Sequence, residues 1–313
     1  MVLVDGYGRP LLNLRIALTR HCNLRCEYCH MEGEENGEES SATMSVDEVV
    51  RIARIAVELG VSKIKLTGGE PLVRKDILEI VKGIASIDGL RDLSMTTNGV
   101  LLCSLAQGLR AAGLQRVNIS LPTLSAELYN KLTGGKLQDV LEGVKAAVDA
   151  GFSPVKLNML VLKCVNEEDF GEMISFAREA GAVLQLIELE PVNVSWPYYI
   201  ANHKALDGYE VLLSQKALKV ETRRFMQNRR VYYLPSVQVE VIRPSENAEF
   251  CAGCTRMRVT SDGKLKTCLM RNDDLVDFLT PMRNGASDRE LARLFEVANA
   301  KRKPYNSSKC VEI

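Results

Sequence analysis

The chain has 313 residues, of which 46% are hydrophobic and 26% charged, a balance typical of a folded protein with a large core. Forty basic residues balance forty acidic ones, so overall charge gives no reason to expect nucleic acid or a membrane surface as a partner. The N-terminus lacks a signal-peptide pattern, and no segment reaches the roughly 18 apolar residues of a membrane span, so we expect a cytoplasmic protein.

Short β-prone runs alternate with longer stretches of helical period between about residues 11 and 190. The strands are expected at LNLRIALT, SKIKL, DLSM, RVNISL, VKLNMLVL and VLQLIEL. This alternation predicts βα units and a parallel sheet, with a full or partial barrel competing with an open doubly wound sheet. After residue 190 the pattern changes: Pro191, Trp196 and Pro197 interrupt it. Three short antiparallel strands (KVETRRF, RRVYYL, VQVEVIR) and a late helix (DRELARLFEVANAKRK) are predicted there.

Polar, glycine-containing loops follow several of these strands: TGGEP (67–71), TTNG (96–99) and SLPT (120–123). Parallel α/β folds place active sites at the carboxyl ends of strands, so we expect these loops to converge. Each loop alone is also typical of an ordinary turn. The two glycines of TGGEP would let the backbone approach a ligand closely, and Glu70 could accept a hydrogen bond from an ammonium or hydroxyl group.

The loop after the first strand, RHCNLRCEYCH, carries three cysteines: Cys22, Cys26 and Cys29. A structural zinc site and a conventional iron–sulfur cluster each take four protein ligands, so this group is one ligand short. A 4Fe-4S cluster held by three cysteines would leave one iron open to an exchangeable ligand. Two alternatives remain, namely buried core thiols and a zinc site completed from a distance. The polar neighbours of these cysteines disfavour the core alternative.

A second group of three cysteines, Cys251, Cys254 and Cys268, lies in FCAGCTRMRVTSDGKLKTCL. SDG predicts a turn between two short strands, which would bring Cys268 back beside the CxxC pair. A zinc ribbon is the alternative, although the histidines are distant in sequence. Arg256 and Arg258 alternate along the proposed strand and so share one face, which suits a phosphate or carboxylate but equally a solvated hairpin face.

Clustering of six cysteines into two short groups indicates metal binding in a reducing compartment. The other three, Cys103, Cys164 and Cys310, are most simply free thiols with no assigned role.

Taken together, these motifs resemble the radical S-adenosylmethionine (SAM) enzymes and, within them, the GTP 3',8-cyclase family. The resemblance covers residues 14 to about 269, through LRIALTRHCNLRCEYC, KIKLTGGEPLVRKD, TTNG, VNISLPT, VKLN and FCAGCTRMRVTSDGKLKTCL. It implies an α/β fold: a partial (β/α)6 TIM-type barrel over residues 1–200. A small C-terminal cap, residues 201–313, would carry the second cluster and GTP-binding residues.

The resemblance also implies the cofactors and the reaction. Two 4Fe-4S clusters would each be held by one cysteine group, with SAM on the open iron of the first and the GTP base on that of the second. SAM cleavage to a 5'-deoxyadenosyl radical, hydrogen abstraction from C3' of GTP and bonding to C8 would begin molybdenum cofactor (molybdopterin) biosynthesis. The implied SAM contacts are Tyr28, Gly69 and Ser120, and the implied GTP contacts are Arg15, Lys65, Thr96, Lys156, Arg256, Met257 and Arg258.

Two features depart from the common family pattern. Gln185 stands where bacterial and eukaryotic relatives carry arginine, and the chain ends KCVEI instead of two glycines, as in archaeal-type members. The expected partners are GTP as substrate, an external electron donor and a downstream pterin synthase. Two rival hypotheses are a peptide-modifying radical SAM enzyme with an auxiliary cluster, and a non-catalytic zinc or iron–sulfur protein for binding or electron transfer.

Overall fold

A computed structural model describes residues 2–34 and 43–306, and within these residues twelve strands form one continuous sheet. The first six strands lie side by side in chain order, each parallel to the next. They are β1 (Asn13–Ala17), β2 (Lys63–Thr67), β3 (Asp92–Thr97), β4 (Arg116–Ser120), β5 (Val155–Val161) and β6 (Val183–Glu188). All six predicted strands are therefore confirmed.

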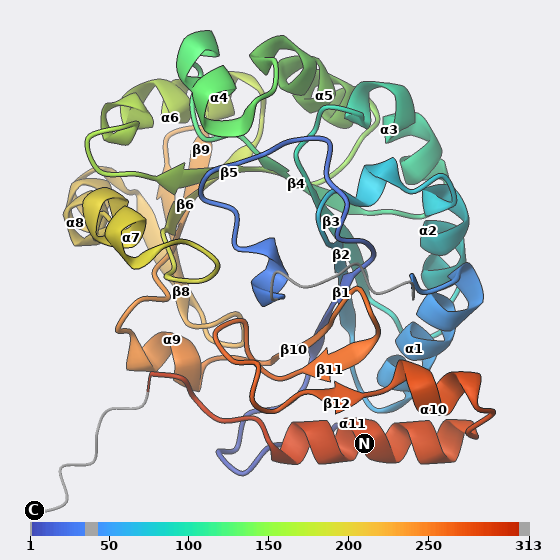
Figure 1. Cartoon of the computed structure of the whole chain (residues 1–313). Coiled ribbons are helices and arrows are strands. Elements are labelled where there is room, and N and C mark those ends of the chain that lie inside the picture. Colours follow the sequence, from blue (N-terminus) through green and yellow to red (C-terminus); the bar gives the residue numbers. More distant parts are fainter. Residues whose placement is uncertain (1, 35–42, 307–313) are drawn as a thin grey trace, which may run out of the picture.

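Helices between these strands cover the outer face of the curved sheet, as the ring of coils in Figure 1 shows. They are α1 (Val46–Glu58), α2 (Ile77–Ala85), α3 (Leu102–Ala111), α4 (Ala126–Thr133), α5 (Leu137–Asp149) and α6 (Phe170–Glu179). Local signals set their ends: Ser45 and Glu48 form a capping box at the start of α1. The short α4 was not predicted; Ser125 caps it and Gly134, in the left-handed conformation, ends it.

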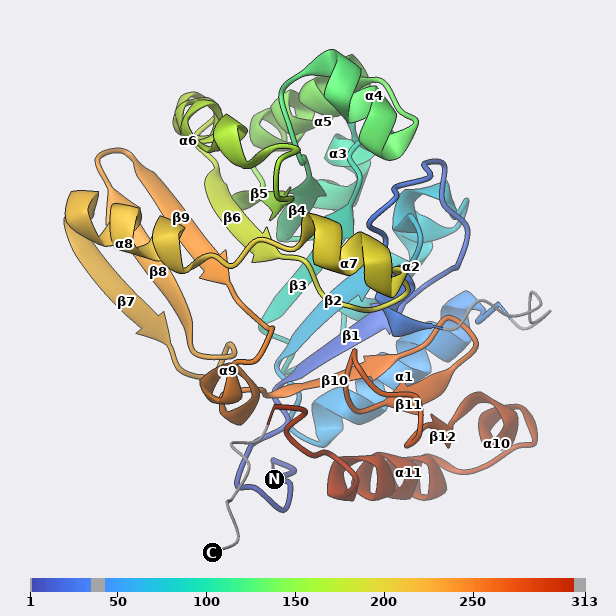
Figure 2. The same cartoon turned by 60° about the vertical axis from the view of Figure 1, so that its left-hand side comes forward.

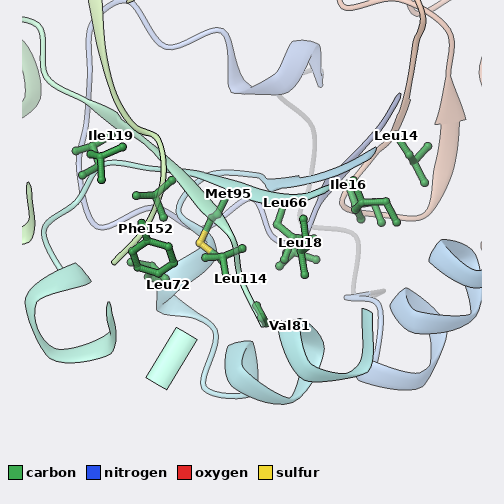
Figure 3. Packing of buried hydrophobic residues seen from close by; sticks show 14 of the residues in the cluster. Leu14, Ile16, Leu18, Leu66, Leu72, Val81, Met95, Leu114, Ile119 and Phe152 are labelled. Carbon is green, nitrogen blue, oxygen red and sulfur yellow. The ribbon is translucent and has the colours of Figure 1, made fainter. Parts of the chain in front are cut away.

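Alternation of side chains along each strand separates the core from the interior of the barrel. Leu14 and Ile16 of β1, Leu66 of β2 and Met95 of β3 are buried and point toward the helices (Figure 3). The polar residues between them, such as Arg15, therefore point to the opposite face. The same strand thus contributes both to the hydrophobic core and to the wall of the barrel's interior.

The C-terminal part extends the sheet at both edges (Figure 2). At one edge β9 (Val237–Ile242) lies parallel beside β6, and β8 (Arg229–Leu234) and β7 (Lys219–Arg223) follow in antiparallel order. At the other edge β10 (Arg256–Val259) lies parallel beside β1, followed by β11 (Lys264–Lys266) and β12 (Val276–Asp277). Both predicted antiparallel segments are confirmed, and the domain boundary at residue 200 stays a prediction.

The remaining described helices are α7 (Trp196–Asn202), α8 (Asp207–Lys216), α9 (Ala248–Ala252), α10 (Leu279–Arg283) and α11 (Asp288–Ala300), with single turns η1 (Met31–Gly33), η2 (Pro71–Val73) and η3 (Glu167–Asp169). The predicted late helix is α11. Trp196 and Pro197 do interrupt the βα pattern, but they also begin α7, because proline is tolerated in a first turn and Ser195 caps it. No helix in the described ranges has the length and apolar character needed to cross a membrane.

Candidate active site

The strands enclose a cavity of about 340 Å³ whose wall consists largely of their inward-facing side chains. Register brings distant residues together here, because Arg15 of β1 pairs with Lys65 of β2 on one side and with Arg258 of β10 on the other. Basic residues outnumber acidic ones around this cavity. The basic residues are Arg9, Arg15, Lys63, Lys65, Arg116, Lys156, Arg223, Arg229, Arg256, Arg258, Arg302 and Lys303; the acidic ones are Glu32, Asp92, Glu188 and Glu190.

Both cysteine groups line this same cavity, although more than two hundred residues separate them in sequence. Cys22, Cys26 and Cys29 lie on the loop after β1, and all six thiols are free. The predicted hairpin between β10 and β11 is present and carries Cys268 back toward Cys254. Among residues 2–34 and 43–306, no three His, Cys, Asp or Glu side chains converge on a single-ion site.

The thiols of the first group receive hydrogen bonds from nearby N–H groups. The backbone N–H of Leu24 lies 3.4 Å from Cys22 Sγ, and that of Met31 lies 3.4 Å from Cys29 Sγ. Burial, together with the charges of the nearby Cys29 and Cys22 thiolates, raises the pKa of the Cys26 thiol to about 12. Three thiolates would therefore coexist here only beside a positively charged group such as a metal cluster.

The TGGEP loop packs directly against the backbone that leads into the first cysteine group. A Cβ atom added at Gly69 would lie 2.3 Å from the backbone oxygen of His21, and one at Gly68, where φ is +143°, would lie 2.4 Å from that of Thr19. The Gly69 N–H donates to Thr19 O at 2.7 Å. The two glycines are thus required for contact with the cysteine loop, in addition to any approach to a ligand.

Glu70, expected to accept from a ligand, is buried and already engaged by internal donors. Its carboxylate accepts from Thr97 Oγ1 at 2.7 Å and from the backbone N–H groups of Asn98, at 2.6 Å, and Leu72, at 3.0 Å. Asn98 in turn donates to Asn23 Oδ1 at 2.7 Å. Glu70 therefore joins the TGGEP and TTNG loops to the cysteine loop, which explains their convergence.

Glu32, which no sequence motif indicated, is the buried counterion of two predicted GTP contacts. It forms an ion pair with Arg258, contacts Arg15 NH1 at 3.2 Å and accepts from Thr67 Oγ1 at 2.6 Å. Burial opposes its ionisation, but the Arg15 and Arg258 charges outweigh this and hold the pKa of the carboxyl well below its usual range. The solvated-hairpin alternative for Arg258 is therefore wrong, because Arg258 is buried.

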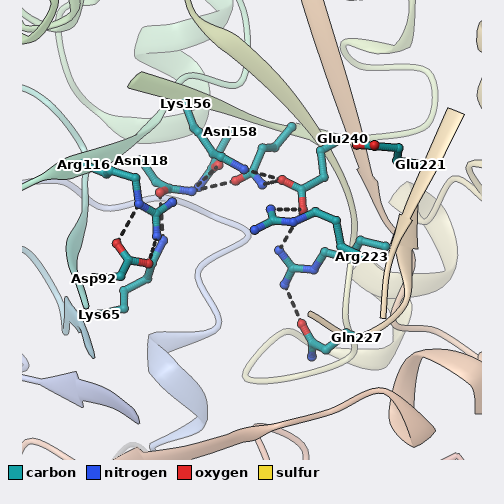
Figure 4. Close-up of polar contacts among 12 residues, drawn as sticks. Lys65, Asp92, Arg116, Asn118, Lys156, Asn158, Glu221, Arg223, Gln227 and Glu240 are labelled. Atoms are coloured by element: carbon teal, nitrogen blue, oxygen red, sulfur yellow. Dashed lines mark hydrogen bonds and ion pairs between the residues drawn. The ribbon is translucent and has the colours of Figure 1, made fainter. Parts of the chain in front are cut away.

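Lys65 and Arg256 face the cavity without a carboxylate partner among the described residues. Lys65 Nζ donates to Asn118 Oδ1 at 2.8 Å, and Asn118 donates to Gln185 Oε1 at 2.6 Å (Figure 4). Burial lowers the pKa of Lys65, and the charges of Arg15 and Arg116 lower it further. Burial, followed by the charge of Arg15, likewise lowers the pKa of Arg256. These shifts describe positive charges crowded together, an environment that an anion would relieve.

Nearly all other predicted contacts also line the cavity, namely Tyr28, Gly69, Thr96, Ser120 and Lys156. Met257 differs: its side chain is fully buried in the hydrophobic core on the opposite face of β10, because side chains alternate along a strand and its two arginine neighbours take the cavity face. The Met257 side chain therefore takes no part in the cavity wall, and a GTP contact at this position stays a prediction. Cys310 and the variant ending lie outside the described residues.

Two family descriptions match most of the chain: Radical SAM superfamily over residues 16–177 and Molybdenum Cofactor Synthesis C over residues 182–308. A protein of Pyrococcus horikoshii is 48% identical, and the match covers 98% of this chain and 99% of that protein. A protein of Thermococcus kodakarensis is 49% identical, covering 97% of this chain and 99% of that protein. Both are named "Probable GTP 3',8-cyclase". The chain belongs to the GTP 3',8-cyclase family of the radical SAM superfamily.

Solved structures agree with this family assignment at the level of the fold. Streptococcus suis SuiB bound to S-adenosylmethionine has a TM-score of 0.64 at 19% identity, covering 87% of this chain and 64% of SuiB. The chain thus spans less than two thirds of that protein. Native anSMEcpe with bound AdoMet has a TM-score of 0.53 at 16% identity, covering 84% of this chain and 76% of that chain. The partial-barrel prediction is confirmed.

Membership of the GTP 3',8-cyclase family implies SAM and two 4Fe-4S clusters, and the chemistry of this cavity fits them. Each cysteine group supplies three free thiols to the wall, and each contains a sulfur that accepts from a backbone N–H. For the second group this donor is the Asn306 N–H, 3.4 Å from Cys251 Sγ. Such hydrogen bonds to sulfur are a feature of iron–sulfur sites.

Proposed function

We propose that the chain is a GTP 3',8-cyclase that joins C3' and C8 of GTP in a SAM-dependent radical reaction, the first step of molybdenum cofactor biosynthesis. One observation carries this proposal: two separate groups of three thiols face a single cavity whose wall between them is basic. A non-catalytic metal protein would have no use for this enclosed basic wall.

Cys22, Cys26 and Cys29 would hold the first cluster, which when bound supplies the electron that cleaves SAM reductively. The residues of the chain itself would position SAM. Gly69 and Ser120 would contact SAM from the ends of β2 and β4, and Tyr28 would do so from within the cysteine loop. Cys251, Cys254 and Cys268 would hold the second cluster on the GTP side of the cavity.

The predicted GTP contacts suit a triphosphate, which brings about four negative charges into the barrel. Lys65 and Arg256 lack carboxylate partners in the described part of the chain, so their charges are available to phosphate oxygens. Arg15 and Arg258 are held in place by Glu32. Arginine forks suit phosphate because they donate two parallel hydrogen bonds. A peptide substrate would leave this charge unused, which disfavours the peptide-modifying alternative.

The proposed reaction has two requirements in the cell. The reaction needs an external one-electron donor, and its cyclised product needs a downstream pterin synthase. Both requirements fit a cytoplasmic enzyme in a reducing compartment.

The test is anaerobic reconstitution with iron and sulfide, then incubation with SAM, a reductant and GTP. We expect 5'-deoxyadenosine together with a cyclised GTP product in the parent chain. Cys26→Ala should produce neither, whereas Cys103→Ala, which changes an exposed free thiol outside both groups, should match the parent. Formation of 5'-deoxyadenosine without any GTP-derived product in the parent would overturn the proposed substrate.

A further inference from the structure

A second group of basic residues surrounds the buried carboxylate of Glu240 on β9. Three cations meet this one carboxylate: Lys156 contacts Oε2, Arg223 NH1 lies 3.0 Å from Oε1, and Arg229 NH1 lies 3.8 Å from Oε1. Figure 4 shows Lys156 and Arg223 converging on Glu240 from different strands. Neutral Gln185 also donates to Glu240 and adds no charge. The cluster therefore carries two more positive than negative charges.

Arg229 retains unused hydrogen-bonding capacity inside the cavity wall. Its side chain is only 9% exposed, and its Nε is buried without a hydrogen-bond partner. Its NH1 group lies 3.8 Å from Glu240, longer than the roughly 2.7–2.9 Å of a charge-assisted hydrogen bond. A buried, unsatisfied guanidinium N–H is costly. Arg229 lines the cavity, so an anion bound there could interact with its guanidinium group.

The surrounding structure fixes Arg229 in relation to the second cysteine group. Its NH2 group donates to Gln227 Oε1 at 2.5 Å, and the Gln227 N–H donates to the backbone oxygen of Gly253, between Cys251 and Cys254, at 2.9 Å. The guanidinium carbon also lies 5.9 Å from the centroid of the Phe250 ring. Arg229 is thus anchored to the cysteine loop and is no freely mobile surface arginine.

The charge of Arg229 belongs to the same electrostatic field as the predicted GTP contacts. Burial lowers the pKa of its guanidinium; Glu240 raises it, and the charges of Arg15 and Arg223 lower it. These arginines therefore repel one another across the cavity, and a multiply charged anion between them would remove that repulsion.

We infer that Arg229 and Arg223, presented by the β7–β8 hairpin and held by Glu240, form a further binding subsite for the phosphates of the nucleotide substrate. This inference rests on the proposed function and adds GTP contacts from the edge of the sheet that β9, β8 and β7 form. Glu240 acts as a positioning residue, because it orients the two arginines and Lys156 and does not itself bind the phosphates. Arg223 and Arg229 lie in a part of the chain that the sequence motifs do not cover.

The test compares GTP with guanosine, which lacks the phosphates, by equilibrium binding to the anaerobically reconstituted chain. Arg229→Gln should weaken GTP binding by about 30-fold or more and leave guanosine binding unchanged. Arg230→Gln is the matched control, because Arg230 is next on the same strand but its side chain points to the other face and is 54% exposed. It should bind both compounds as the parent does.

Iron content and SAM affinity of Arg229→Gln should equal those of the parent. If Arg229→Gln loses iron, Arg223→Gln replaces it with the same expected loss for GTP alone, and Arg229→Lys should retain part of the affinity.

Equal GTP affinity in Arg229→Gln and Arg230→Gln would overturn the subsite, as would equal losses for GTP and guanosine. In either case a parent chain that still binds GTP leaves the proposed function standing. A parent chain that binds no GTP overturns both.

Discussion

Replacing Glu32 by glutamine removes the counterion of two arginines while keeping nearly the same shape. The side chains of Arg15 and Arg258 are only 17% and 8% exposed, so water cannot take over the role of the carboxylate. Breaking a buried ion pair costs about 3–5 kcal/mol. Glutamine can still accept the hydrogen bond from Thr67, and the Arg15 side chain keeps partial exposure to water in the cavity. We therefore expect a loss of unfolding free energy at the lower end of this range, about 3 kcal/mol.

For a chain of 313 residues, about 3 kcal/mol corresponds to a fall in Tm of roughly 5 °C. The assay is anaerobic thermal unfolding of the reconstituted chain. Glu58→Gln is the control. Glu58 is exposed on α1, and within the described residues its ion-pair partner is the half-buried Arg54, so the change should stay within about 0.5 kcal/mol. Adding GTP should raise the Tm of Glu32→Gln more than that of the parent, because the triphosphate replaces the missing negative charge.

The pH dependence of this effect has a definite sign. Because the folded state depresses the pKa of Glu32, its stabilisation is complete above the ordinary glutamate pKa of about 4.3 and is lost only as the pH falls below it. The Tm difference between Glu32→Gln and the parent should therefore be constant between about pH 6 and 8. An unfolding temperature for Glu32→Gln equal to that of Glu58→Gln would refute the counterion argument.

Three further predictions concern the two cysteine groups, Lys156 and the TGGEP loop. Cys268→Ala should keep the first cluster and some uncoupled SAM cleavage but lose cyclised product, whereas the parent should contain about eight iron atoms; parental product formation by Cys268→Ala would show that the second group is structural. Because burial lowers the pKa of Lys156 to about 8, its ammonium charge is present below that pH and lost above it. GTP affinity, measured by equilibrium binding, should thus fall as pH rises through about 8, and Lys156→Arg should stay flat; an identical fall in both would contradict this role. Gly69→Ala forces a Cβ against the His21 backbone and should reduce SAM cleavage by about 100-fold through displacement of the cysteine loop, while Gly171→Ala, where a Cβ meets nothing, should be neutral; equal 5'-deoxyadenosine yields would exclude the steric argument.

The amino-acid pattern was sufficient to predict the parallel strands, the antiparallel strands beyond residue 200 and both cysteine groups. Each of these depends on short-range pattern: alternating β-prone and helical runs, a turn signal such as SDG, and cysteines a few residues apart. Because such signals act between neighbours in the chain, they can be recognised without knowing the fold. The same period-2 alternation would also have excluded the Met257 side chain from the face that Arg256 and Arg258 share.

Which side chains meet at the cavity depends on how the strands join in three dimensions. Glu32 and Arg258 are 226 residues apart, and their ion pair exists because β10 lies beside β1 in a particular register. Arg229 reaches the same cavity only because β9 and the β7–β8 hairpin are added beyond β6. A sequence pattern shows which side chains share a face of a strand, but it does not show which strand edges join. The partners of a buried charge are fixed by those joins.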